Sequence, residues 1–262
     1  MSDEAMRDDQ RRPVVLITGV GRARSIGAAI AGRLAAFGSD VAFSYWDGYD
    51  ASMPFGSEPA FHEELAERMR ATGARVLPIE ADLADSQTPA ALIARVRDEL
   101  GPVRALVLSH AHSVDSGILD TSVESFDAHF AVNTRSSWLV IKAFAEAYEG
   151  PHGWGRIVAL TSDHTAHNLA YGASKGALDR IVKAAAVELA HLGITANLVN
   201  PGPIDTGWMT PELATELAAE TALGRLGTPQ DTADLVSFLL SYAGGWINGQ
   251  LLHSNGGFHL GV

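Results

Sequence analysis

Strand-like apolar runs alternate with helical patterns along almost the whole chain, and this alternation is the feature that most restricts its fold. The strand-like runs are Val14–Thr18, Val41–Ser44, Arg75–Ile79, Ala105–Ser109, Ile157–Thr161, Thr195–Val199 and Gln250–His253. The helical patterns between them are Ile26–Phe37, Glu63–Thr72, Pro89–Leu100, Val123–Tyr148, Ala170–Leu192 and Thr228–Leu240. Nearly all-apolar strands in strict alternation with helices predict a parallel sheet covered on both faces, a doubly wound α/β fold.

A single domain is expected, because neither an internal repeat nor a low-complexity linker divides the 262 residues. Residues 1–12 are polar and are expected to form a flexible tail, which leaves residues 13–262 as the predicted catalytic domain. Two connections should be irregular: Trp46–Pro59 is long and aromatic, and Pro201–Pro211 is rich in proline and glycine and should be mobile. A substrate loop is expected at about 203–223.

The composition argues against several classes of function. The formal net charge of −12 disfavours binding to nucleic acid, whose phosphates need a basic surface, and to anionic membranes. The chain has no cysteine, which excludes disulfides, thiol nucleophiles and thiolate metal sites. No apolar run approaches the length of a membrane span, and the first residues lack the apolar core of a signal peptide, so a cytoplasmic location is expected.

A tyrosine and a lysine four residues apart mark the candidate chemistry. Tyr171 and Lys175 fall about one turn apart on the predicted helix Ala170–Leu192, so both side chains can reach one site. An ammonium group near a phenol favours the phenolate and lowers the phenol's pKa from about 10 toward the range of a working general acid. Ser162 adds a hydroxyl at the carboxyl end of the strand Ile157–Thr161.

The turn between the first strand and the first helix, from Thr18 to Gly27, is rich in glycine. Glycines let a backbone approach a pyrophosphate closely, and a helix N-terminus offers it unpaired N–H groups. This is the position of a dinucleotide site in doubly wound folds. The expected contacts in the turn are Gly19, Gly21, Ser25 and Ile26.

The choice between NADP(H) and NAD(H) is made near the end of the second strand. An acid there binds the ribose 2′-hydroxyl of NAD, whereas a cation accommodates the 2′-phosphate of NADP. Tyr45 and Trp46 occupy the strand end, and Arg22 and Arg24 lie in the glycine-rich turn. Two guanidinium groups beside a phosphate subsite favour NADP(H). Asp47 is the candidate for the alternative, NAD(H).

Together these motifs resemble the short-chain dehydrogenase/reductase family over about Val14 to Phe258. The motifs that carry the resemblance are Thr18-Gly19…Ile26-Gly27, Asp82-Leu83, Asn133, Ser162, Tyr171-x-x-x-Lys175, Asn200-Pro201-Gly202-x-x-x-Thr206 and Asn248-Gly249-Gln250…Asn255-Gly256-Gly257. The resemblance implies a Rossmann fold that binds a nicotinamide dinucleotide. Further implied cofactor contacts are Asp82 with Leu83 at the adenine, the backbone of Ser109, His110 and Ala111, and Pro201, Gly202, Ile204 and Thr206 at the nicotinamide.

The resemblance also implies roles for four side chains in carbonyl reduction. Tyr171 would give a proton to the carbonyl oxygen, and Ser162 would hydrogen-bond that oxygen. Lys175 would depress the pKa of the phenol and hydrogen-bond the nicotinamide ribose. Asn133 would position a water that feeds protons to Lys175.

Four features depart from the family pattern. The glycine-rich turn is longer than usual and has Ser25 in place of the middle glycine, which is reminiscent of divergent enoyl-thioester reductases, although these space the Tyr and Lys more widely. The sequence Ser109-His110-Ala111-His112 replaces Asn-Asn-Ala-Gly after the fourth strand, so side-chain roles there do not carry over. The segment from Ser162 to Tyr171 is shorter than usual, and the last strand lacks the usual Thr-Gly and Asp-Gly-Gly.

Histidines follow the central strands at His110, His112, His164 and His167. Asp115 and Asp163 lie nearby, but hydride transfer in the family needs no metal, so no metal site is predicted. The expected lining of the substrate pocket is His112, His164, His167 and Trp208.

The sequence therefore predicts an NADP(H)-dependent oxidoreductase that interconverts a ketone and a secondary alcohol, with a 3-oxoacyl thioester as one candidate substrate. One alternative is a dinucleotide-binding sensor or scaffold without chemistry, against which the complete catalytic set argues. The other is an enoyl-thioester reductase. The predicted helices Val123–Tyr148 and Ala170–Leu192 carry apolar residues on more than one face, so a homo-tetramer is expected first and a homodimer second.

Overall fold

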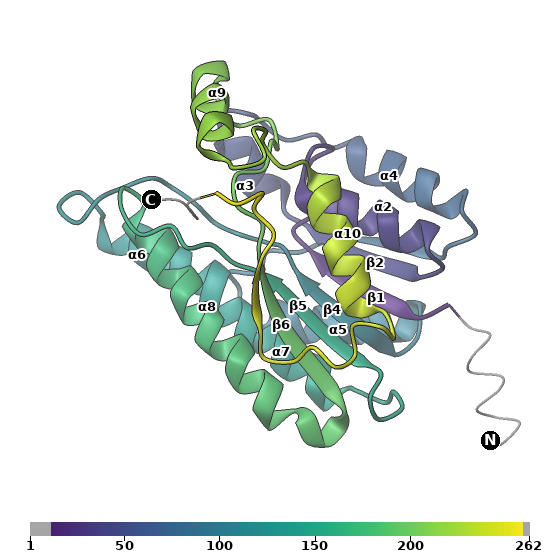
Figure 1. Ribbon diagram of the computed structural model, residues 1–262. Coiled ribbons are helices and arrows are strands. Elements are labelled where there is room, and N and C mark those ends of the chain that lie inside the picture. Colours follow the sequence, from purple (N-terminus) through teal and green to yellow (C-terminus); the bar gives the residue numbers. More distant parts are fainter. Residues whose placement is uncertain (1–11, 259–262) are drawn as a thin grey trace, which may run out of the picture.

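A seven-stranded parallel sheet forms the centre of the molecule, for which the computed structural model describes residues 12–258 (Figure 1). The strands are β1 (Val14–Thr18), β2 (Asp40–Tyr45), β3 (Val76–Glu80), β4 (Val103–Leu108), β5 (Gly155–Leu160), β6 (Ile194–Asn200) and β7 (Leu251–His253). They lie in the order β3-β2-β1-β4-β5-β6-β7, and each neighbouring pair is parallel. The predicted doubly wound fold is confirmed, and its strand order reverses between β1 and β4.

Helices cover both faces of this sheet, as the alternation of the sequence predicts (Figure 1). One face carries α2 (Ile26–Ala36), α4 (Phe61–Arg70) and α10 (Pro229–Leu240), and the other carries α5 (Thr88–Glu99), α7 (Ser136–Glu146) and α8 (Leu169–Glu188). Successive strand residues point to opposite faces, so each side of the sheet has its own apolar core. In β1, Leu16 belongs to the core under α5, α7 and α8, whereas Ile17 belongs to the core under α2, α4 and α10.

The predicted long helix Val123–Tyr148 is wrong in one respect, because it is not a continuous α-helix. It consists of α6 (Val123–His129), a π-helical segment Phe130–Arg135, and α7. Two backbone carbonyls of this segment accept hydrogen bonds from side-chain hydroxyls. The Ser136 hydroxyl donates to Val132 O, and the Ser137 hydroxyl donates to Asn133 O at 2.8 Å. A widened turn of this kind commonly marks a functional site.

Two helices lie in segments that the sequence pattern left irregular. The connection after β2 contains α3 (Asp47–Ser52), and the expected substrate loop contains α9 (Pro211–Glu220). Thr210 caps α9 and proline follows it, both ordinary helix-start signals. None of the residues of α9 is buried, and Figure 1 shows the helix projecting from the body of the molecule. Among residues 12–258, no helix is long and apolar enough to cross a membrane.

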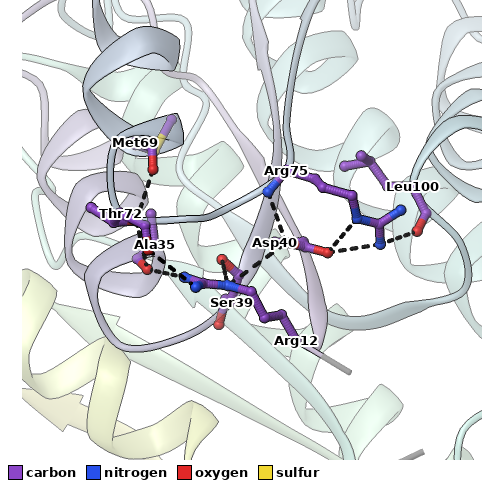
Figure 2. A network of polar contacts seen from close by, with 8 residues as sticks. All are labelled: Arg12, Ala35, Ser39, Asp40, Met69, Thr72, Arg75 and Leu100. Atoms are coloured by element: carbon purple, nitrogen blue, oxygen red, sulfur yellow. Dashed lines mark hydrogen bonds and ion pairs between the residues drawn. The ribbon is translucent and has the colours of Figure 1, made fainter. Parts of the chain in front are cut away.

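The amino end of the sheet is fixed by a network of charged side chains (Figure 2). The buried carboxylate of Asp40 accepts from the backbone N–H of Arg75 at 2.9 Å and from its Nε at 2.7 Å. Arg12 lies 3.7 Å from the same carboxylate and donates to Ala35 O at 2.5 Å. Arg12 is therefore anchored, while the rest of the expected flexible tail, residues 1–11, lies outside the described residues.

Candidate active site

A cavity of about 1600 Å³ opens at the carboxyl ends of the strands, where a doubly wound fold binds its ligands. The predicted site residues that line it are Gly19, Gly21, Arg22, Ser25, Ile26, Tyr45, Trp46, Asp82, Leu83, Ser109, His110, Ala111, His112, Ser162, His164, His167, Tyr171, Lys175, Pro201, Gly202, Ile204, Thr206 and Trp208. Two predicted residues do not line it: Asn133 is buried behind the cavity wall, and Arg24 points elsewhere.

Tyr171, Lys175 and Ser162 come together on one wall of this cavity. Lys175 Nζ lies 5.6 Å from the centre of the Tyr171 ring and donates to Leu160 O at 3.0 Å. The Ser162 hydroxyl interacts with the Tyr171 phenol, whose pKa it lowers, and accepts from the backbone N–H of His164 at 3.2 Å. The end of β5 and the first turns of α8 thus present a phenol, an amine and a hydroxyl to one space.

The pKa of Tyr171 differs from the sequence expectation. Burial, together with the nearby Tyr49, raises the pKa of Tyr171 to about 12, although its hydrogen bond with Ser162 acts in the opposite direction. Burial also lowers the pKa of Lys175 to about 8. The expected depression of the phenol's pKa by Lys175 is wrong for this arrangement, because loss of solvation disfavours both charged forms. The phenol is therefore held as a protonated donor.

Asn133 sits in the π-helical segment and braces the loop after β4. Its Nδ2 donates to His112 O and to the Ser174 hydroxyl, both at 2.9 Å, and its Oδ1 accepts from His112 N at 2.7 Å. The widened turn carries this amide into contact with the backbone at His112 and with α8. Its predicted role in positioning a water stays a prediction.

His110 is a buried structural group whose side chain is fully engaged by protein. Its Nδ1 lies 2.6 Å from the Thr18 hydroxyl, and its Nε2 lies 2.8 Å from the Ser136 hydroxyl and 3.1 Å from Val132 O. Burial lowers the pKa of His110 to about 3. A Cβ on Gly19 would lie 2.4 Å from His110 Cα, so only glycine permits this close approach of the turn to the loop after β4.

Tyr49, which the sequence reasoning missed, enters the cavity from α3. Its hydroxyl accepts from Ser113 N at 3.2 Å and donates to Ser113 O at 3.3 Å, and its ring lies 5.3 Å from that of His112. His112 in turn meets the ring of His129 edge-on at 4.6 Å. The only sequence signal was the aromatic content of Trp46–Pro59, which does not show which aromatic ring turns inward.

The arginines of the glycine-rich turn have protein partners. Arg22 stacks on Phe55 at 3.8 Å, lies 3.9 Å from the Asp50 carboxylate and donates to Thr206 O at 3.3 Å. Arg24 pairs with Asp205 at 2.7 Å.

The acid that lies directly against Gly21 is Asp50, whose pKa burial raises. Asp47, the acid singled out in the sequence, lies 3.8 Å from His62 instead. Asp50 was missed because its place depends on the path of α3.

The remaining histidines frame the rim of the cavity. His164 and His167 are exposed and line it, and His167 has a positive φ of 63°, a conformation that a non-glycine residue rarely adopts. Within residues 12–258, no group of three or more His, Asp or Glu side chains could hold a metal ion.

Comparison with known proteins places this geometry in context. Residues 19–259 match the family described as "Enoyl-(Acyl carrier protein) reductase". The uncharacterized oxidoreductase YjdA of Bacillus subtilis is 36% identical, over 94% of this chain and 96% of its own length. The NADPH-dependent aldehyde reductase-like protein of Arabidopsis thaliana chloroplasts is 38% identical, over 94% and 93%. A blue fluorescent protein from a metagenomic library, solved with NADPH, superposes with a TM-score of 0.84 at 32% identity, covering 95% of this chain and 98% of its own.

Proposed function

The chain belongs to the short-chain dehydrogenase/reductase family and is an NAD(P)-dependent oxidoreductase, and from this premise we propose that it uses NADP(H) to interconvert a ketone and a secondary alcohol. The observation that carries the proposal is the meeting of Tyr171, Ser162 and Lys175 in the cavity that the glycine-rich turn also lines. A 3-oxoacyl thioester is one candidate substrate.

The residues around the cavity fit a dinucleotide. Gly19 brings the turn against the loop after β4, and α2 begins beside it at Ser25, whose hydroxyl accepts from Ala28 N at 3.1 Å. A helix that starts here directs its remaining unpaired N–H groups into the space beside the turn, which suits a pyrophosphate. The bound nicotinamide would supply the hydride chemistry.

Protein groups that line the same cavity would complete carbonyl reduction. Tyr171 holds a proton on its phenol oxygen, and the Ser162 hydroxyl lies beside it to orient a carbonyl oxygen. The Lys175 amine is fixed next to the phenol by its hydrogen bond to Leu160 O, where it would hydrogen-bond the nicotinamide ribose.

The choice of NADP(H) over NAD(H) is supported by the named cofactor of two similar proteins and by Arg22 at the rim of the cavity. If Arg22 binds the 2′-phosphate, changing it to Ala should narrow the preference for NADPH over NADH by about tenfold or more, the value of one charge-assisted hydrogen bond. Steady-state kinetics with both cofactors measures this. A wild type that prefers NADH would assign the ribose to Asp50, the buried acid beside Gly21.

Enoyl-thioester reduction is the second candidate, favoured by the description of the matched family and by Ser25 in the turn. The four-residue spacing of Tyr171 and Lys175 argues against it. A panel that follows NADPH absorbance over ketones, 3-oxoacyl thioesters and enoyl thioesters separates the two. Turnover of ketones or oxoacyl thioesters is expected, and turnover of enoyl thioesters alone would overturn the proposal.

Two further features belong to the proposal. We infer an assembly of identical chains, a tetramer before a dimer, because α6, α7 and α8 expose the large apolar side chains Val123, Trp138 and Val187. A cytoplasmic location stays a prediction.

A further inference from the structure

The glycine-rich turn, which is longer than the family pattern, reaches across to the substrate loop. Arg24 Nη2 donates to the Asp205 carboxylate at 2.7 Å, and Arg22 Nη1 donates to Thr206 O at 3.3 Å. The two contacts join residues separated by 181 and 184 positions in the chain. At Gly207, where φ is +88°, a Cβ would lie 3.1 Å from Arg24 Nη1, so the arginine lies close against the loop backbone.

The same turn is also joined to the segment after β2. Its Ala23 N–H donates to the Glu58 carboxylate at 2.9 Å, and the Arg22 guanidinium lies on the Phe55 ring. Phe55 and Thr206 both line the cavity. The glycine-rich turn therefore contacts both the segment after β2 and the substrate loop.

We propose that the extended glycine-rich turn is a latch that holds the substrate loop closed over the cavity, with Arg24 and Asp205 as positioning residues that touch neither substrate nor cofactor. This inference rests on the proposed function, since it assumes that the cavity is the cofactor and substrate site. It also gives the extra residues of the turn a role. Arg24 does not line the cavity, so the role proposed here differs from the contact with the cofactor's phosphate that the sequence predicts for it.

The geometry of the Arg24–Asp205 ion pair suits a contact that can open and close. Asp205 Oδ1 accepts from Gly207 N at 3.2 Å as well as from Arg24, so one carboxylate shapes the loop and attaches it. The side chains of Arg24 and Asp205 keep 61% and 46% of their surface exposed. An ion pair this exposed is weak and sensitive to salt, so it biases the loop toward closure without locking it.

The test compares Arg24→Gln, Asp205→Asn and the double variant that carries both changes, all in the full chain. The first readout is hydrogen–deuterium exchange of residues 203–210, which needs no cofactor. The second is the dissociation rate of NADPH and of NADH, together with KM and kcat for the best carbonyl substrate. Arg33→Gln serves as the matched control, because Arg33 forms a partly exposed ion pair with Asp234 at 3.0 Å between α2 and α10.

Each single variant should exchange residues 203–210 about two- to fivefold faster and release both cofactors faster by the same factor. The carbonyl KM should rise while kcat does not fall. The double variant should exchange no faster than the single variants, because each single change already breaks the ion pair. High salt should bring wild type toward the single variants. The Arg33→Gln protein should match wild type. Unchanged exchange in the single variants, additive effects of the two changes in the double variant, or an effect on NADPH but not on NADH would overturn the latch. A chain that binds neither cofactor would refute the proposed function, while the hydrogen-exchange result would still decide for or against the latch.

Discussion

Burial keeps the Tyr171 phenol protonated, so this residue is the proposed proton donor of the candidate site. Tyr171 is partly buried, its pKa is raised, and it retains its proton across the ordinary pH range. Changing Tyr171 to Phe removes this donor without altering the shape of the wall. Activity should fall by about 10²–10⁴-fold, the range of general acid catalysis, while the dissociation constant of NADPH stays nearly unchanged.

Kinetics and fluorescence titration of the Tyr171→Phe protein check this expectation. Tyr148→Phe is the matched control, because the Tyr148 hydroxyl donates to Pro151 O and does not line the cavity. Activity of Tyr171→Phe close to that of Tyr148→Phe would contradict the assignment of the proton donor.

Because His110 is buried in its neutral form, the free energy of unfolding of the protein should depend on pH. Burial lowers its folded-state pKa to about 3 from an unperturbed 6.5, so the unfolded chain takes up this proton first as the pH falls. The contribution of neutral His110 to the free energy of unfolding is thus fully present above about pH 6.5 and is lost as the pH falls toward 3. Relative to His110→Gln, the free energy of unfolding of wild type should fall by roughly 1.4 kcal/mol per pH unit in that window. Urea unfolding at pH 4 to 7 measures the difference, and parallel curves for the two proteins would contradict it.

The sequence was informative at residues whose place follows from the sheet alone. Tyr171, Lys175 and Ser162 could be brought together because parallel strands end at one edge and helix residues four apart share a face. Tyr49 and Asp50 could not, since their positions depend on how α3 folds back over the cavity. The partner of Arg24 was equally unreadable, because Asp205 lies 181 residues away.

At the scale of elements, the pattern located every strand and most of the helices but not the π-helical segment Phe130–Arg135. A widened turn adds one residue to the helix. This shifts the pattern of apolar residues too little to be recognised in a short segment of sequence. Its cause is tertiary: Asn133 is drawn to the backbone at His112, and His110 lies against Val132 O. The short helix α3 was missed because six residues carry too little periodicity to separate a helix from a loop.

The network at the amino end of the sheet should stabilise the connection between β2 and β3 (Figure 2). Asp40 forms ion pairs with both Arg75 and Arg12, and its carboxylate also accepts a hydrogen bond from the backbone N–H of Arg75. Asp40→Ala should lower the free energy of unfolding by about 2–3 kcal/mol, because it removes a buried charged acceptor from several donors. Glu99→Ala breaks only the exposed pair with Arg95 and should cost less than about 0.5 kcal/mol. Chemical denaturation of both variants tests this, and equal losses would contradict a special role for Asp40.

At the scale of the whole molecule, apolar side chains remain outside after the fold is complete. On α7, Val140, Ile141 and Phe144 face the sheet, whereas Trp138 on the same helix is 48% exposed. Val187 on α8 is 77% exposed. Tyr242 and Trp246, which follow α10, are also almost fully exposed. The exposed apolar side chains of α7 and α8 (first patch) and those that follow α10 (second patch) suit two kinds of symmetric contact.

We therefore expect a homo-tetramer in which each patch faces its own copy. Light scattering at micromolar concentration should give about four times the chain mass of 27.7 kDa. Placing a charge in one patch, as in Val187→Asp, should reduce the assembly to dimers, because the charge would be buried without a partner. Trp246→Asp should also leave dimers, which use the first patch, and the double variant should be a monomer. A wild type that scatters as a monomer would refute the assembly, since an isolated chain would then leave both patches in water with nothing to cover them.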